Sequence, residues 1–192
     1  MTMERIIRTA KLLYTSLGIS KVSMGRVAKE SDISENALYS KFRLKEDLVV
    51  ACAKREVACL SLSAEYIKEQ AGSALEVILF ACFDQFYYNC SLYPNFFYDL
   101  SFFPEADKLW KNYQYERRKR CTGYLLKGIS EGDFVSNHDY ELIPIVLSEQ
   151  LNKLNVQKTV HQKTRIISII REVCTEKGNF RLMQLLEQKK TI

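Results

Sequence analysis

The sequence predicts an all-α fold, with an N-terminal three-helix domain over residues 1–48 and a larger helical domain over residues 49–192. Apolar residues recur three and four positions apart through most of the chain, which is the period of an amphipathic helix. No segment alternates apolar and polar residues as a half-buried strand does. Two short helical patterns at residues 23–42 are separated by a turn of about three to four residues, which predicts a helix-turn-helix.

The first helix is expected over residues 2–17, where Ile6, Ala10 and Tyr14 belong to one apolar stripe. Gly18 follows this stripe and predicts the end of the helix, because glycine adopts the left-handed conformation found there. We expect this helix to pack across the two helices that follow it.

The helix-turn-helix is defined by two serines that each stand immediately before a helical pattern. Ser23 and Ser34 are expected to cap the two helices, since a hydroxyl can accept the unpaired N–H groups of a first turn. Val27, Leu38 and Phe42 are expected to hold the pair together. A third helix is expected to begin just beyond, near residue 45.

Residues 27–48 read VAKESDISENALYSKFRLKEDL. This string resembles the tetracycline-repressor (TetR) family of bacterial regulators, whose pattern usually reads I-A-x-x-A-G-V-S-x-G-T-L-Y-x-x-F-x-S-K-E-x-L. The spacing of the matched residues is unbroken. Three positions depart from the pattern, because Asp32 and Asn36 replace glycines and Leu44 replaces the small polar residue that caps the next helix. Asp tolerates a left-handed turn, whereas Leu44 is expected to leave the next helix without a side-chain cap.

The resemblance implies that residues 1–48 bind double-stranded DNA, with the second helix of the motif in the major groove. Hydroxyls and cations would hold phosphates, while an amide, a carboxylate and small side chains would face the bases. The expected DNA-binding residues are Ser23, Arg26, Ser34, Glu35, Asn36, Ala37, Tyr39, Ser40, Lys41 and Lys45.

The charge of the chain is concentrated in this region. Residues 1–55 contain 11 Lys and Arg against 6 Asp and Glu, a balance of +5, which equals the net charge of the whole chain. Residues 56–192 are therefore neutral in sum. An excess of positive charge around a helix-turn-helix is typical of a phosphate-binding surface.

The rest of the chain is expected to form further helices. They are expected at residues 45–70, 73–89, 94–102 and 104–130, then from about residue 141, from residue 159 to a stop at Gly178, and at residues 180–187. Pro144 favours a start near residue 141, because proline is tolerated only in the first turn. The basic run Arg117–Arg120 is interpreted as a solvated surface, since four consecutive residues point around a helix.

Residues 80–124 contain 15 of the 22 aromatic residues. An aromatic stripe at helical spacing is usually part of a solid core, but tyrosines also supply the apolar wall and the hydroxyl that a small-molecule pocket needs. Both alternatives are open from the residues alone. In the resemblance this region lies over a cavity for a small apolar or aromatic ligand, whose expected contacts are Phe83, Phe86, Tyr87, Phe97, Trp110 and Tyr113.

The two long C-terminal helical patterns each have a continuous apolar face. In the family they pair with their twofold mates as a four-helix bundle, so the resemblance implies a homodimer. The expected interface residues are Ile143, Val146, Leu147, Leu151, Ile166, Ile167, Ile170 and Val173.

The sequence has few features of a secreted protein, an enzyme, a metalloprotein or a membrane protein. The six cysteines form no C-x-x-C pair and are expected to be reduced and mostly buried. No nucleophile–base pair, phosphate loop or metal spacing is present, so we expect no enzyme, cofactor or metal. The N-terminus lacks an apolar signal segment and the longest apolar run, Val77 to Phe83, is too short for a membrane span, so we expect a cytoplasmic protein.

Two functions remain. The resemblance implies a transcriptional repressor that a ligand releases from a palindromic operator. The alternative is a helical dimeric adaptor protein that has lost specific DNA recognition, which the acidic side chains of Glu30, Asp32 and Glu35 near the turn would favour. Salt-dependent DNA retention would separate the two.

Overall fold

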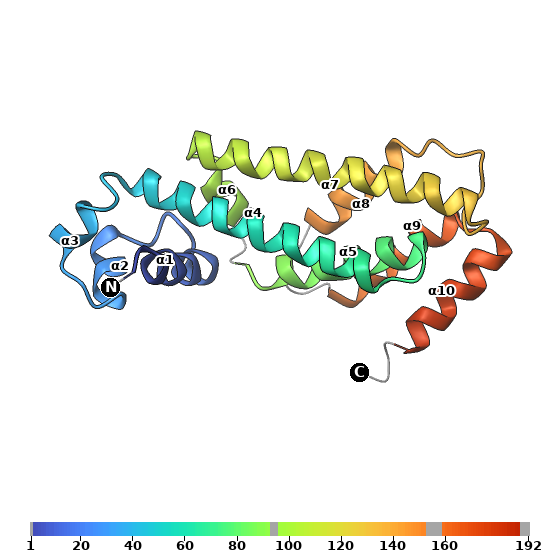
Figure 1. Cartoon of the computed structure of the whole chain (residues 1–192), viewed down its shortest axis with the longest axis horizontal. Helices are drawn as coiled ribbons and strands as arrows, with labels where there is room; N and C mark the ends of the chain where they lie inside the picture. Colours follow the sequence, from blue (N-terminus) through green and yellow to red (C-terminus); the bar gives the residue numbers. More distant parts are fainter. Residues whose placement is uncertain (1, 93–95, 153–158, 189–192) are drawn as a thin grey trace. The chain divides into compact units, whose positions relative to one another are not determined.

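The computed structural model describes residues 2–92, 96–152 and 159–188, and over these residues the chain forms ten α-helices (Figure 1). Among the described residues there is no strand, and one isolated antiparallel bridge joins Phe134 to Cys174. The all-α prediction is confirmed. The helices are α1 Met3–Leu17, α2 Met24–Glu30, α3 Glu35–Tyr39, α4 Lys45–Gln70, α5 Ala74–Cys90, α6 Phe96–Leu100, α7 Pro104–Ser130, α8 Leu142–Asn152, α9 Thr159–Glu172 and α10 Glu176–Gln188.

The chain divides into two compact units. The first contains Met1–Leu62 and Ser91–Gln114, and the second contains Ser63–Cys90 and Tyr115–Ile192. Helices α4 and α7 each contribute residues to both units. The functional boundary that we predict after residue 48 stays a prediction, because the first unit includes α6 and the start of α7 as well as α1, α2 and α3.

The core of the first unit joins the N-terminal helices to α6 and α7. Helix α1 packs on α2, and α2 packs on α3, as expected for a helix-turn-helix domain (Figure 1). Their buried residues form a single apolar cluster with Leu100 of α6 and Ala106 of α7. Phe96, Phe103 and Trp110 cover the edge of this cluster and are themselves half-buried. A segment expected to belong to the ligand-binding domain therefore shares a core with the helix-turn-helix.

Local backbone chemistry explains the ends of the first three helices. Ser23 Oγ accepts the N–H of Arg26 at 3.2 Å and Ser34 Oγ accepts the N–H of Ala37 at 3.1 Å, so both predicted caps are present. Helix α1 ends at Gly18, whose φ of 93° lies in the region that favours glycine. Asp32 in the turn has a φ of 58°, the left-handed conformation that the replacement of glycine by Asp predicts.

The start of α4 differs from the expectation that it lacks a side-chain cap. Leu44 supplies no capping group, but Asp47 Oδ2 accepts the backbone N–H of Leu44 at 2.9 Å. A carboxylate three residues into the helix thus reaches back to the preceding N–H, which is half of a capping box. A carboxylate in the first turn also interacts favourably with the helix dipole.

The second unit is built from α5, α8, α9 and α10, with the C-terminal parts of α4 and α7. Helix α5 contacts α8, α9 and α10, and its apolar residues lie at the centre of the core. Residues 73–76 form half of a capping box at the start of α5. Ser73 Oγ accepts the N–H of Glu76 at 3.2 Å, but the Glu76 carboxylate accepts the N–H of Gly72, at 2.8 Å, instead of that of Ser73.

The predicted stop at Gly178 is wrong, because α9 ends at Glu172 and Gly178 lies inside α10. A β-carbon at position 178 would come within 2.0 Å of the Asp133 carbonyl oxygen, so only glycine lets α10 approach the turn that follows α7. Pro144 falls in the first turn of α8, as its chemistry requires. Within the described residues, no helix combines the length and apolar character that a bilayer span requires.

Candidate nucleic-acid interface and ligand site

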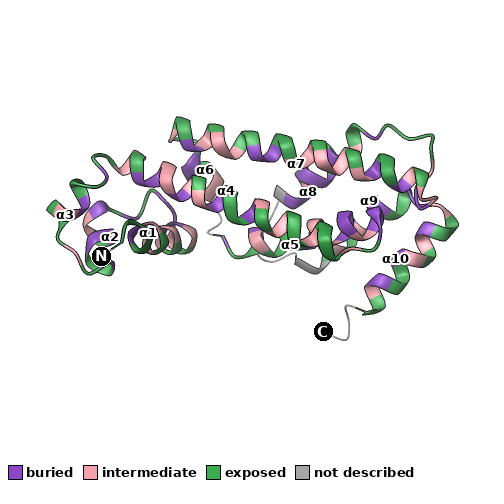
Figure 2. Cartoon of the chain, viewed as in Figure 1, coloured by how far each residue is buried: buried purple, intermediate pink, exposed green. Residues whose placement is uncertain are grey.

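The outer face of α3 is built on one deeply buried anchor. Leu38 is 0% exposed in the core of the first unit, and it fixes the rotation of this short helix. Glu35, Asn36 and Tyr39 are exposed as a result. Figure 2 shows α3 coloured by this burial. Ser40 and Lys41 are also exposed just beyond the helix, while Ala37 is half-buried. The residues predicted to meet the bases thus share one accessible region.

Three predicted contacts are serines whose hydroxyls already bond to the backbone. Ser23 and Ser34 accept backbone N–H groups as caps, so each hydroxyl proton is available for donation to a phosphate oxygen. Ser40 instead donates its proton to the Ala37 carbonyl at 2.8 Å. Its oxygen can still accept, which suits a base amino group better than a phosphate.

Glu35 lies against the helix that precedes it. A β-carbon at Gly25 of α2 would be 2.5 Å from Glu35 Oε1, so this carboxylate occupies the space that glycine leaves open. Gly25 is in the first turn of α2, where the helix dipole favours a negative charge. The Glu35 side chain is therefore held in a defined place at the front of α3.

Lys45 differs from its expected role as a phosphate contact. Its Nζ donates to the Ile19 carbonyl oxygen at 2.6 Å and the side chain is half-buried. Burial lowers the pKa of Lys45, and the charge of Asp99 opposes this shift. The ammonium group therefore stabilises the segment that connects α1 to α2.

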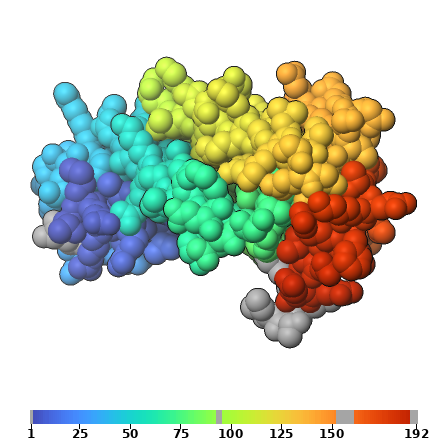
Figure 3. Space-filling model, turned by 45° about the vertical axis from the view of Figure 1, so that its right-hand side comes forward, coloured from blue at the N-terminus to red at the C-terminus, as the bar shows by residue number. Residues whose placement is uncertain are grey.

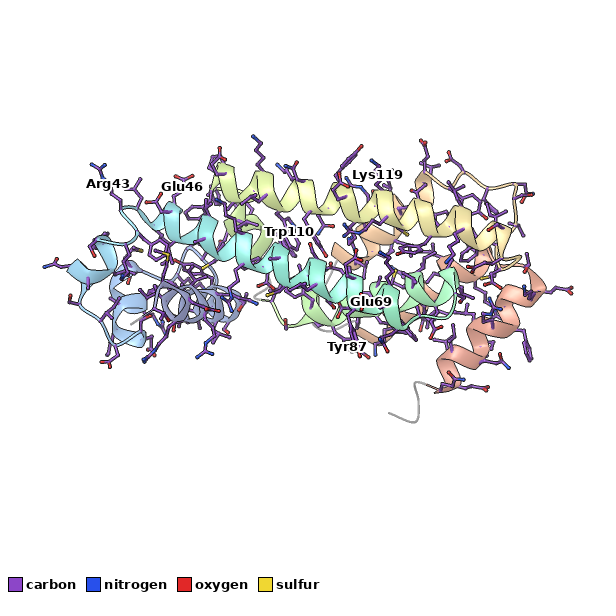
Figure 4. The ribbon with its side chains drawn as sticks, viewed as in Figure 1. Arg43, Glu46, Glu69, Tyr87, Trp110 and Lys119 are labelled. Carbon is purple, nitrogen blue, oxygen red and sulfur yellow. The ribbon has the colours of Figure 1, made fainter. Side chains whose placement is uncertain are left out.

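Arg43 is a candidate that the sequence reasoning missed. It follows α3, is exposed, and its side chain extends away from the ribbon (Figure 4). The family pattern places no defined residue type at this position, so only the local excess of positive charge could have indicated it. Lys41, Arg43 and Arg26 are exposed cations on or beside the helix-turn-helix and are suited to phosphate oxygens. The DNA contacts themselves stay predictions.

The six aromatic residues predicted to line a ligand site are divided equally between the two units. In the first unit, the Trp110 ring stacks on Phe97 with ring centroids 5.1 Å apart, and its centroid lies 5.4 Å from that of Tyr113. In the second unit, Phe83 and Phe86 belong to the buried core.

The remaining aromatic residue, Tyr87, is 57% exposed, with the ammonium group of Lys163 4.4 Å from its ring centroid. Phe86 next to it is buried in the core, whereas Tyr87 lies on the other side of α5. Tyr87 is therefore open to solvent, and its expected place in a ligand site stays a prediction.

The basic run at residues 117–120 also differs from its interpretation as a wholly solvated surface. Lys119 is exposed and points away from α7 (Figure 4). Arg117, however, is half-buried and donates to Ser148 Oγ of α8 at 3.0 Å, and this serine is buried. One arginine of the run therefore connects two helices of the second unit.

The predicted dimer residues are mostly inside the protomer. Five of the eight are at most 2% exposed and belong to the core of the second unit: Leu147, Leu151, Ile166, Ile170 and Val173. Ile143 and Ile167 are half-buried, and Val146 is 38% exposed. The sequence showed apolar faces correctly, but α5 and α10 cover them. The accessible apolar residues of α8 are Leu142, Ile145 and Val146, and α10 exposes Phe180 and Met183. The C-terminal segment that includes α10, in red, lies at the surface in the space-filling view (Figure 3).

A capped helix-turn-helix within an all-α chain is typical of DNA-binding proteins of the helix-turn-helix class. Residues 6–52 match the family described as "Bacterial regulatory proteins, tetR family". Residues 6–52 therefore form a DNA-binding domain of the TetR type, which indicates a DNA-binding transcriptional regulator.

Solved structures are similar to the chain over nearly its whole length. Their sequence identities are only 15–16%, so this similarity establishes the fold alone. The reduced form of Escherichia coli NemR is 15% identical with a TM-score of 0.73, covering 90% of this chain and 96% of that chain. The ketosteroid transcriptional regulator of Mycobacterium tuberculosis is 16% identical with a TM-score of 0.66, covering 92% and 97%. Bacillus subtilis FadR in complex with stearoyl-CoA is 15% identical with a TM-score of 0.67, covering 88% and 96%. No curated protein sequence matches the chain.

Proposed function

We propose that this regulator is a repressor that binds a palindromic operator as a homodimer and leaves it when a small apolar or aromatic ligand binds. The exposed face of α3 carries the proposal. Asn36 lies at its front, where an amide can pair with the edge of an adenine. Lys41 and Arg43 follow the helix and are exposed, as phosphate contacts must be. Buried Leu38 holds the helix in place.

The homodimer is supported by the exposed apolar residues of the second unit. Leu142, Ile145 and Val146 recur at helical spacing on the outer side of α8. A twofold interface would bury this stripe against its own copy. It would also present two recognition helices to half-sites ~34–36 Å apart, one turn of DNA.

The ligand is supported by the aromatic stack of Phe97, Trp110 and Tyr113 in the first unit. Flat apolar side chains with a phenol among them suit an apolar or aromatic molecule. Among the similar structures, the FadR complex contains stearoyl-CoA and another regulator is named for ketosteroids. A ketosteroid and the stearoyl chain are largely apolar, and we expect a ligand with such an apolar part here.

DNA binding is tested by selecting duplexes of about 30 base pairs, about three helical turns, from a random pool over the purified protein. We expect palindromic duplexes to be enriched and their affinity to fall steeply as salt rises. Asn36→Ala should change the enriched bases, since one bidentate pair contributes about 1–3 kcal/mol of discrimination. Retention of all duplexes alike, by both proteins, would argue against operator recognition.

The ligand is tested by identifying, with mass spectrometry, compounds that the protein retains from a cell extract. Trp110 is the only tryptophan in the chain, so its fluorescence reports their binding. Ligand and operator must weaken each other by the same factor, typically about 5–150-fold. A compound that quenches Trp110 without changing DNA affinity would be a bound molecule without a regulatory role.

A further inference from the structure

A buried carboxylate in α6 bonds to the connection that leads into the helix-turn-helix. Asp99 is 6% exposed, and its Oδ2 accepts the backbone N–H of Ser20 at 2.8 Å. These residues are 79 positions apart in the sequence, and both belong to the first unit. A hydrogen bond to an ionised acceptor is among the stronger ones in proteins.

The other side of the same peptide group is held by α4. The carbonyl oxygen of Ile19 belongs to the peptide whose N–H is that of Ser20, and it accepts the Nζ of Lys45 at 2.6 Å. Asp99 also acts electrostatically on Lys45. One peptide plane between α1 and α2 is thus fixed by a carboxylate from α6 and by an ammonium group from the first residue of α4.

The placement of Asp99 depends on apolar contacts of α6. Leu100, its neighbour, is 3% exposed in the core that contains the helix-turn-helix. Phe97, two residues before Asp99 in α6, stacks on Trp110 of α7. A shift of α6 would withdraw Asp99 from Ser20 and leave a buried carboxylate without this donor, which is costly. The position of α6 and the conformation of the connection are therefore energetically linked.

We propose that Asp99 is a positioning residue for DNA binding, which couples α6 to the helix-turn-helix through the Ile19–Ser20 peptide. The inference rests on DNA binding and goes beyond the proposed ligand response, because it assigns the coupling to a named bond. DNA favours the conformation in which the bond is formed. A change at Phe97 or Trp110 that moves α6 would disfavour this conformation.

The test measures binding of the selected operator duplex to the intact protein and to three variants. Asp99→Ala removes the acceptor and is expected to weaken binding about fivefold or more, the lower end of allosteric coupling. Asp99→Asn keeps an oxygen that can accept the Ser20 N–H and is expected to restore most of the affinity. Asp107→Ala is the matched control and should leave binding unchanged, since Asp107 is a half-buried carboxylate of the same unit that pairs with Lys111 within α7.

Two further measurements exclude a merely structural role for Asp99. Trp110 emission should change when operator is added to the unmodified protein and to Asp99→Asn, and should not change in Asp99→Ala at saturating operator. Hydrogen exchange of the Ser20 amide in the unmodified protein should slow when operator binds, and this measurement needs no variant.

Equal operator affinity and an equal Trp110 response in Asp99→Ala and the unmodified protein would overturn the inference alone. Unchanged exchange at Ser20 on operator binding would do the same. An unmodified protein that retains no duplex would contradict both this inference and the proposed function.

Discussion

The carboxylate of Glu35 at the start of the recognition helix occupies the space above Gly25, where a β-carbon would lie 2.5 Å from Oε1. Gly25 therefore determines where a predicted base-contacting side chain rests. The close neighbour is the end of a flexible side chain, so a methyl group at position 25 would displace Glu35 at little structural cost.

Gly25→Ala is expected to change the sequence preference of DNA binding without lowering stability. Alanine is a better helix former than glycine by about 0.8–1.0 kcal/mol, which offsets the displacement of Glu35. Duplex selection and thermal unfolding measured on the same preparation check both parts. Glu35→Ala in the same selection shows the preference when the carboxylate is absent. An unaltered preference in Gly25→Ala would mean that Glu35 does not face the bases.

Lys41 and Lys45 are expected to differ as contributors to DNA binding, although both were predicted contacts. Lys41 is exposed, so Lys41→Ala should reduce the slope of log affinity against log salt by about 0.9. Lys45 already bonds to Ile19, so Lys45→Ala should mainly destabilise the first unit, by roughly 1.5–3 kcal/mol. Filter binding at several salt concentrations and denaturant unfolding separate the two effects. A larger change of the salt slope for Lys45→Ala than for Lys41→Ala would show that Lys45 contacts a phosphate.

The helix pattern was predictable because it depends on local chemistry. The caps at Ser23 and Ser34 and the left-handed Asp32 follow from residue type and near neighbours, and the structure contains all three. The expected roles of Lys45 and Ile170 changed because each depends on a distant partner. No spacing in the sequence reveals that Lys45 donates a hydrogen bond to the Ile19 carbonyl oxygen. Likewise, an apolar helix face looks the same whether it covers its own core or a second subunit.

Alkaline pH is expected to destabilise the protein through its buried thiols. Burial raises the pKa of Cys52 to about 12, of Cys82 to about 11 and of Cys174 to about 12, from 9.0. These folded-state values exceed the unfolded one, so the stabilisation is complete below pH 9.0 and is lost as pH rises through the folded values. Each thiol should contribute a loss of about 1.4 kcal/mol per pH unit in this window.

Thermal unfolding between pH ~8 and ~10.5 measures this loss, since the window covers the unfolded thiol pKa. Cys82→Ala should flatten the pH dependence relative to the unmodified protein, even though the cavity it creates lowers stability at every pH. Cys59→Ala is the control, because Cys59 is exposed. Identical pH dependences for the two variants would show that Cys82 ionises normally in the folded state.

The proposed homodimer has to use residues that the protomer leaves exposed. Ile170 is 0% exposed, so Ile170→Asp would place a charge in the core and unfold the second unit, whatever its oligomeric state. Ile145 is 44% exposed and Leu142 is 54% exposed on the same side of α8, so aspartate there leaves the core intact.

Ile145→Asp is therefore expected to give folded monomers that have lost tight operator binding. A monomer has a single helix-turn-helix, which contacts only one half-site. Analytical ultracentrifugation measures the mass, circular dichroism confirms the fold, and filter binding measures the affinity. The matched control is Leu62→Asp, which changes an exposed leucine of α4 and should leave the mass and the affinity unchanged. If Ile145→Asp sediments as a dimer, the outer side of α8 lies outside the interface. The exposed Phe180 and Met183 of α10 would then be the next residues to substitute, since they are the other large apolar side chains described as exposed in the C-terminal helices.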